Sequence, residues 1–145
     1  MDTVSFSALE NAREWLKSAS LNKNNENYAK SLYDMEMALE IAVKGVLIAL
    51  GKNFPKKHAV VGLLRRAAQE NGSRSSKEFI ESTEELEKIF NELLELRNIS
   101  GYSFQASVKK EEFKKLAEEY YGKTAHYVEL CDKEITALEK VHKKR

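Results

Sequence analysis

One arginine stands out among the side chains of this sequence that could do chemistry. Arg97 is the last member of a series whose positions alternate four and three residues apart, the spacing of a buried helix face. The other members are Phe79, Thr83, Leu86, Phe90 and Leu93. A guanidinium on such a face is costly unless an anionic or polar group receives it. Its planar fork matches a phosphate better than an ammonium does, so Arg97 is our first candidate for a phosphate-binding residue.

The residues after Arg97 could complete such a site. The sequence continues Asn98-Ile99-Ser100-Gly101-Tyr102, a polar-then-glycine pattern that is typical of a helix end. Asn98 and Tyr102 could add hydrogen bonds to a ligand held by Arg97. The alternative is structural: Arg97 reaches solvent at the helix end or pairs with a nearby glutamate, Glu92 or Glu95. In either case we expect Arg97→Ala to leave the fold intact, because this position lies at the open end of the series.

The histidines and the cysteine give weaker signals. His58 follows Lys56-Lys57 at the expected start of a helix, where a capping or packing role is favoured over ligand binding. His126 and His142 lack metal-ligand spacing, so we expect no metal and no other cofactor. Cys131 is expected to be a small buried residue. Tyr120, Tyr121 and Tyr127 are expected in the core and at an interface rather than as a base-stacking platform. The absence of Gly-rich phosphate loops, GxSxG, HExxH and paired CxxC motifs argues against a conventional hydrolase or nucleotide-binding α/β enzyme.

Composition limits the class of protein. The 145 residues suit one domain, residues 1–145 with a core from about 5 to 140, and 24 basic against 23 acidic residues give a net charge of +1. This balance provides no general attraction to nucleic acid or membrane. The longest apolar segment, residues 41–50, contains Lys44 and is too short to span a bilayer. With a single cysteine and no signal-peptide pattern at the N-terminus, we predict a cytoplasmic protein.

Periodicity predicts five helices and no strand. We expect helices from Ser5 or Ser7 to the break at Asn22–Asn25, from about Glu26 to Leu50, from near His58 to Asn71, from Ser75 or Ser76 past Arg97, and from Ser107 onward, with a loop over residues 99–107. The predicted fold is all-α: an up-and-down four-helix bundle with an additional short helix. Antiparallel packing of the last two helices would place Arg97 and Tyr102 at one end of the bundle.

The second helix carries an unusual apolar run. Ala38–Leu50 is apolar on nearly every side except at Glu40 and Lys44, which indicates burial among several helices or at a subunit interface. Because a five-helix domain has few helices with which to surround such a run, we predict a homodimer formed largely through the second and fourth helices.

The order of short motifs resembles a HEPN domain (higher eukaryotes and prokaryotes nucleotide-binding). The first helix contains Ala12-x-x-Trp15-x-x-x-Ala19 and leads to Tyr28-Ala29. The residues from Ala38 to Leu47 resemble the family pattern A-x-E-x-x-x-K-A-L, and the apolar run then ends in Leu50-Gly51. His58 with Leu63-Leu64 matches H-x-x-x-x-L-L at the start of the third helix, and Arg97-Asn98 lies near the end of the fourth. The resemblance covers roughly residues 5 to 135.

The resemblance implies functions, and also a departure from them. Many HEPN proteins are metal-independent ribonucleases whose signature is Arg, a polar residue and a His five or six positions after the Arg, with paired copies meeting at a homodimer interface. Toxin members that pair with small nucleotidyltransferases carry Arg-x4-His-x-Tyr, where this sequence has Arg97, Tyr102 and Phe104. Tyrosine, with a reference pKa of about 10, is a poor base at pH 7.

Three functions remain open. The first is a dimeric module that binds RNA or nucleotide phosphates through Arg97, with Asn98, Tyr102 and His58 as further ligand-binding candidates, or that partners a nucleotidyltransferase in a toxin-antitoxin-like pair. The second is an active ribonuclease toxin with Arg97 as a catalytic residue and Tyr102 or His58 replacing the histidine. The third is a structural dimer without a ligand.

Overall fold

The computed structural model describes residues 3–53, 60–72, 75–101 and 110–143. Over these ranges the chain forms five helices: α1 (Val4–Asn24), α2 (Tyr28–Ala49), α3 (Val60–Glu70), α4 (Lys77–Gly101) and α5 (Lys110–Lys143). The described residues contain no strand, so the predicted all-α class is confirmed. The prediction of four long helices and one short one is also confirmed, α3 being the short one.

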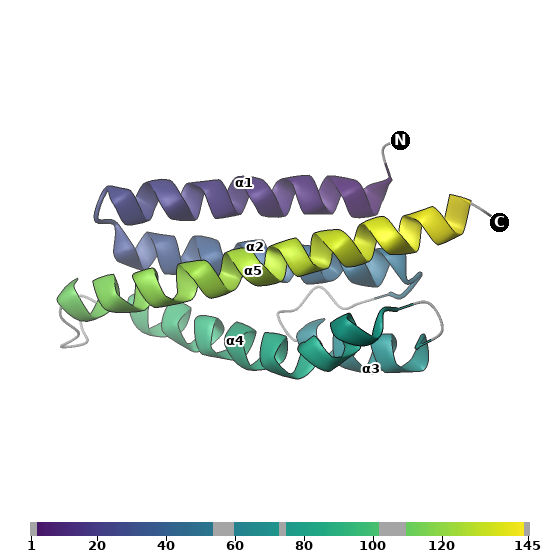
Figure 1. The fold of residues 1–145 in the computed structure, drawn as a ribbon. Coiled ribbons are helices and arrows are strands. Elements are labelled where there is room, and N and C mark those ends of the chain that lie inside the picture. Colours follow the sequence, from purple (N-terminus) through teal and green to yellow (C-terminus); the bar gives the residue numbers. More distant parts are fainter. Residues whose placement is uncertain (1–2, 54–59, 73–74, 102–109, 144–145) are drawn as a thin grey trace.

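The four long helices alternate in direction. In Figure 1, α1 and α4 run one way along the bundle, while α2 and α5 run the other way. The antiparallel relation of α4 and α5 is therefore as predicted. Each of these two helices packs more extensively against α2 than against the other. The helix α2 is the centre of the fold, because it packs against α1, α3, α4 and α5 alike.

This central place explains the apolar run of α2. Its side chains from Ala38 to Leu50 are buried by the surrounding helices, apart from Ile41, Lys44 and Ile48, which are partly exposed. The sequence argument for a homodimer held that a five-helix domain has few helices with which to surround this run. Four helices around α2 are enough, so the burial of Ala38–Leu50 does not require a second copy.

The first helix begins and ends at other residues than expected. Its N-cap is Thr3, whose hydroxyl oxygen accepts the Phe6 amide at 3.3 Å. Ser5, one of the expected caps, is buried and donates to Glu139 of α5 at 2.7 Å. The helix also continues through Asn22 to Asn24. The Asn22 side chain hydrogen-bonds across to α2 and so does not compete with its own backbone.

Helices α1 and α2 end in the same way with different residues. In each, the amide two residues past the cap bonds back five residues, Asn27 to the Asn22 carbonyl and Lys52 to the Leu47 carbonyl. This pattern requires a left-handed residue in between. Gly51 takes that conformation with φ +73° after α2, whereas Glu26 takes it with φ +62° after α1.

The fourth helix follows its prediction at the start and exceeds it at the end. Ser76 caps it, accepting the Phe79 amide at 3.1 Å. The helix continues to Gly101, beyond Ile99 where we had placed the loop. The start of the third helix at His58, the cap at Ser107 and the residue Tyr102 all lie outside the described residues.

The predicted buried face of α4 is confirmed. Phe79, Thr83, Leu86, Phe90 and Leu93 are all buried. On α5, Tyr120, Tyr127 and Cys131 are buried, as expected of core residues, and Tyr121 packs at the edge. None of the described helices is long and apolar enough to cross a membrane.

Candidate functional site

Arg97 is received by a glutamate of another helix. Its Nη1 atom donates to Oε2 of Glu36 at 2.9 Å, which joins the end of α4 to the first half of α2. Glu36 is fully buried, whereas 23% of the Arg97 side chain is exposed. The pair therefore has its acid in the interior and its base at the surface.

This pairing revises the structural alternative for Arg97. Neither expected partner is the one observed, since Glu95 is exposed and Glu92 accepts the hydroxyl of Tyr120 from α5. Removing one member of a buried ion pair leaves the other charge without compensation, which is strongly destabilising. The expectation that Arg97→Ala leaves the fold intact therefore no longer holds.

An aromatic residue of α2 holds the other side of the guanidinium. The Cζ atom of Arg97 lies 4.3 Å from the centroid of the Tyr33 ring, and its Nη2 atom is 3.5 Å from the Tyr33 hydroxyl. Tyr33 is 37% exposed and lies 6.1 Å, centroid to centroid, from Trp15 of α1. A guanidinium stacked on a ring and bonded to a buried carboxylate has little freedom to turn.

The tyrosine–glutamate contacts between α4 and α5 change the pKa of both tyrosines. Burial, the hydrogen bond to Glu92 and its charge together hold the pKa of Tyr120 far above its usual range. Burial, followed by the charge of Glu85 and the hydrogen bond to it, raises the pKa of Tyr127 to about 12. Both side chains are therefore neutral donors at pH 7, and they belong to the interior of the bundle.

Of the four predicted site residues, the structure describes Arg97 and Asn98. Asn98 is exposed on α4, next to Arg97 in sequence. His58 and Tyr102 lie outside the described residues. Within the described part of the chain, no group of three His, Cys, Asp or Glu side chains could hold a metal ion.

Sequence reasoning missed Glu36 and Tyr33. Glu36 had a signal, because it lies four residues after Leu32 and three before Leu39, on the buried face of its own helix. An acid on one buried stripe and a base on another, in helices expected to pack together, predicts a pair. Tyr33 had no comparable signal, since its role depends on how α2 and α4 are rotated against each other.

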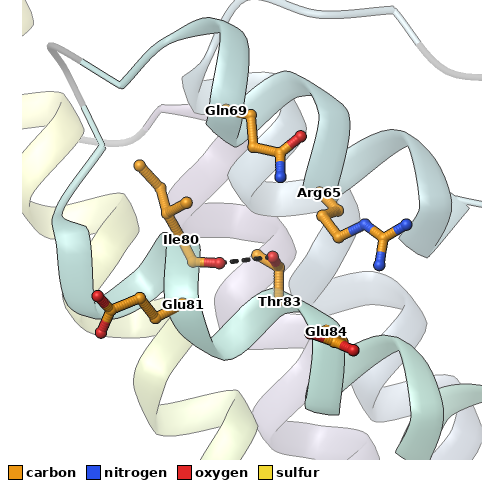
Figure 2. A pocket seen from close by; sticks show the side chains of 6 residues that line it. All are labelled: Arg65, Gln69, Ile80, Glu81, Thr83 and Glu84. Atoms are coloured by element: carbon orange, nitrogen blue, oxygen red, sulfur yellow. Dashed lines mark hydrogen bonds between the residues drawn. The ribbon is translucent and has the colours of Figure 1, made fainter.

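A groove between α3 and α4 also has charged walls. Figure 2 shows Arg65 and Gln69 extending from α3 toward α4. The volume is about 430 Å³, and the lining residues are Arg65, Gln69, Ile80, Glu81, Thr83 and Glu84. The Thr83 hydroxyl donates to the Ile80 carbonyl at 2.7 Å, and Arg65 lies 3.6 Å from Glu87. Because carboxylates outnumber the single guanidinium, this groove disfavours a phosphate.

Comparison with known proteins agrees with the architecture. No curated protein matches this sequence. A sequence model of the HEPN domain matches residues 7–126. This range includes most of α1, all of α2 to α4 with Glu36 and Arg97, and the first half of α5. This match spans most of the chain, and the helical fold is of the same class. The chain therefore belongs to the HEPN domain family, which is associated broadly with nucleotide- and RNA-related functions.

Proposed function

We propose that this chain is a dimeric HEPN module that binds the phosphate groups of RNA or of a nucleotide through Arg97. The observation that carries the proposal is the state of the Arg97 side chain, partly exposed while its Nη1 atom is held by buried Glu36. A donor group fixed in advance loses little conformational entropy when an anion reaches it. Arginines stacked on aromatic rings are a common means of phosphate recognition.

The charge of Glu36 limits how strongly such a site attracts an anion. The ion pair is neutral overall, and the whole chain carries a net charge of only +1. Attraction would therefore come from directed hydrogen bonds more than from a positive field. We expect modest affinity for RNA and a shallow dependence of that affinity on salt concentration.

Binding is favoured over cleavage by the sequence after Arg97. The position of the family's signature histidine is Tyr102, and a tyrosine near its reference pKa of about 10 is a poor general base at pH 7. A partnership with a nucleotidyltransferase and a toxin-antitoxin role stay predictions of the family resemblance.

The outer face of α2 supports the dimeric part of the proposal. Met37, Ile41 and Ile48 are at least partly exposed there. They follow one another at intervals of four and seven residues and so share one face of the helix. Met side chains are enriched in protein interfaces. A second copy seated on this outer α2 stripe, with Tyr33 left at its edge, would bring the two Arg97 sites close to the same interface, because Tyr33 lies one turn before Met37 and contacts Arg97.

RNA binding tests the role of Arg97. Arg97→Lys keeps a positive charge opposite Glu36 but loses the planar fork, and it should weaken binding of a fluorescent single-stranded RNA about tenfold in an anisotropy titration. The matched control is Arg13→Lys, which changes an arginine paired with Glu129 and Asp132 on the α1–α5 side. Equal affinity of all three proteins, or no binding by any, would overturn the proposal.

A cleavage assay separates binding from catalysis. Wild type and Tyr102→His are incubated with labelled RNA without divalent metal. We expect no cleavage by the wild type, and greater cleavage by Tyr102→His, which restores the spacing of the nuclease signature. Robust wild-type cleavage that requires Arg97 would replace the binding proposal with a ribonuclease.

Sedimentation equilibrium tests the dimer. The wild type at micromolar concentration should show twice the chain mass of 16.6 kDa. Met37→Glu places a charge in the outer α2 stripe and should give a folded monomer, whereas Ala137→Glu, at an exposed position of α5, should stay dimeric. A monomeric wild type would remove the dimer from the proposal.

A further inference from the structure

We propose that Trp15 stacks an unpaired base of single-stranded RNA while Arg97 holds a phosphate of the same strand. This inference rests on the proposed function and adds the class of RNA and a second binding group. It begins from a row of three side chains on three helices: Arg97 on α4, Tyr33 on α2 and Trp15 on α1.

The spacing in this row is short enough for one ligand to contact both ends. The Arg97 Cζ atom lies 4.3 Å from the Tyr33 ring centroid, and the Tyr33 and Trp15 centroids are 6.1 Å apart with their planes inclined by 58°. Tyr33 thus links the guanidinium to the indole across the surface of α2. A short stretch of single strand spans these two steps, with its backbone over Arg97 and a base near Trp15.

A small pocket accompanies the indole. Its volume is about 290 Å³, and it is lined by Asn11, Glu14, Trp15 and Ser18, all on α1. This is just below the usual size range of small-molecule sites, so it suits one ring system better than a larger ligand. Trp15 is partly exposed and also packs against the core, so its ring has a fixed position.

The charges of the two sites favour different parts of the ligand: the base at the pocket and the phosphate at Arg97. The Glu14 carboxylate at the pocket repels a phosphate but accepts hydrogen bonds from the amino group of a base. Arg97 at the other end of the row is suited to the phosphate. The α1 side of this row is held in place, because Ser18 and Asn22 donate to buried Asp34 of α2 at 2.8 and 2.7 Å.

The geometry favours a single strand over a duplex. Bases in a duplex are stacked on one another, and their faces are closed to a protein side chain. Unpaired bases can leave the stack and lie against an aromatic ring, which contributes enough to change affinity by about tenfold or more per base.

Trp15 is the single tryptophan of the chain, which gives a direct test. Titration of the wild-type protein with short single-stranded RNA should quench its tryptophan emission, and a duplex of the same length should not. Trp15→Leu should weaken anisotropy-measured binding about tenfold, while Trp15→Phe should keep most of it. The control Tyr121→Leu removes a half-buried aromatic near Lys23 on the α5 side and should not change affinity.

The outcomes separate this inference from the function on which it rests. RNA binding that depends on Arg97 but leaves Trp15 emission unchanged would overturn the stacking site and leave the proposed function standing. The stacking site is equally overturned if folded Trp15→Leu binds as tightly as the wild type, or if the duplex quenches as much as the single strand. Absence of any Arg97-dependent RNA binding would overturn both. The wild-type titration decides the matter even if Trp15→Leu does not fold.

Discussion

The two ends of the bundle hold their acidic side chains in different ways. At the end where α4 begins, Glu134 accepts the backbone amide and hydroxyl of Ser76 at 3.2 and 2.9 Å, and Glu139 accepts the hydroxyl of Ser5. At the other end, buried Glu36 is held by the charged Arg97. Figure 1 shows these as opposite ends, with α2 and α4 extending between them. Neutral donors serve both ends, because buried Asp34 of α2 accepts from Ser18 and Asn22. The difference is the additional cation: Arg97, which reaches the surface, holds Glu36.

The residues that end α2 and α1 also differ between the two ends of the bundle. Near the start of α4, α2 ends with Gly51 in the left-handed region, the residue that adopts it with least strain. At the Arg97 end, α1 ends with Glu26 in that region. Locally unfavourable choices therefore collect at the end that carries the candidate site. Departures from local rules are expected to gather where a protein has a function to serve.

The largest expected effect is at the ion pair. Arg97→Ala leaves the carboxylate of Glu36 in the interior without its cation, and it should lower the free energy of unfolding by about 3 to 5 kcal/mol. Urea unfolding followed by circular dichroism measures this change.

Two further variants interpret that result. Arg97→Lys should lose less, because it keeps the charge. The double variant Glu36→Leu with Arg97→Leu should recover much of the stability, since an apolar pair of similar volume can replace a buried ion pair. A loss below about 1 kcal/mol in Arg97→Ala would mean that the ends do not differ in this way.

Ser76→Ala tests the end of the bundle where α4 begins and where Ser76 donates to Glu134. The variant loses both the helix cap and a hydroxyl donor to Glu134, and we expect a loss of about 2 kcal/mol in the same unfolding assay. Ser82→Ala is the control, because its hydroxyl donates to the Glu78 carbonyl one turn earlier in its own helix. A loss for Ser76→Ala as large as that for Arg97→Ala would contradict the proposed difference between the ends.

The burial of Tyr127, together with its contact with Glu85, predicts that the stability of the fold depends on pH in the alkaline range. The pKa of Tyr127 is about 12 in the folded chain and about 10 when unfolded, so folding favours its neutral form. The stability linked to the neutral form of Tyr127 is complete below pH 10 and is lost as the pH rises toward 12. The free energy of unfolding should fall less steeply across that pH range for Tyr127→Phe than for the wild type. Parallel curves would show that Tyr127 is not responsible for the pH dependence.

The smallest effects concern the two left-handed residues. Gly51→Ala should lower the free energy of unfolding by about 1 kcal/mol, because a side chain is strained at φ +73°. Glu26→Gly should raise it by about 0.5 kcal/mol, since strain is relieved at the cost of a more flexible unfolded chain. Thermal unfolding of both variants checks the signs. Equal signs would show that the helix ends are equivalent.

Most of the fold could be predicted because its signals are local. The helix count, the buried face of α4 and the caps Gly51 and Ser76 all follow from spacing and residue type along one segment. Errors arose where a side chain is used by a distant segment. Asn22 does not break α1 because Asp34 of α2 engages it, and Ser5 is not the cap because Glu139 of α5 takes its hydroxyl.

Only one member of the ion pair at the site was predicted from the sequence, and the reason is the same. Arg97 can be identified from its position on an apolar face of its helix, but its partner Glu36 lies 61 residues away in the sequence. Identifying it requires knowing which faces of α2 and α4 meet. The homodimer argument failed at this level too, because the number of helices around α2 is a property of the packed bundle and not of its sequence.

The bond between Ser5 and Glu139 has a practical consequence for engineering. It ties the first turn of α1 to the last part of α5. Figure 1 shows the start of α1 and the end of α5 at the same end of the bundle, opposite the C-terminal end of α4, the helix that carries Arg97 near its end. A reporter, a surface tether or a second domain joined at either end would leave the Arg97 region facing outward. A short linker between the two ends would also allow new termini to be opened elsewhere in a circularly permuted chain.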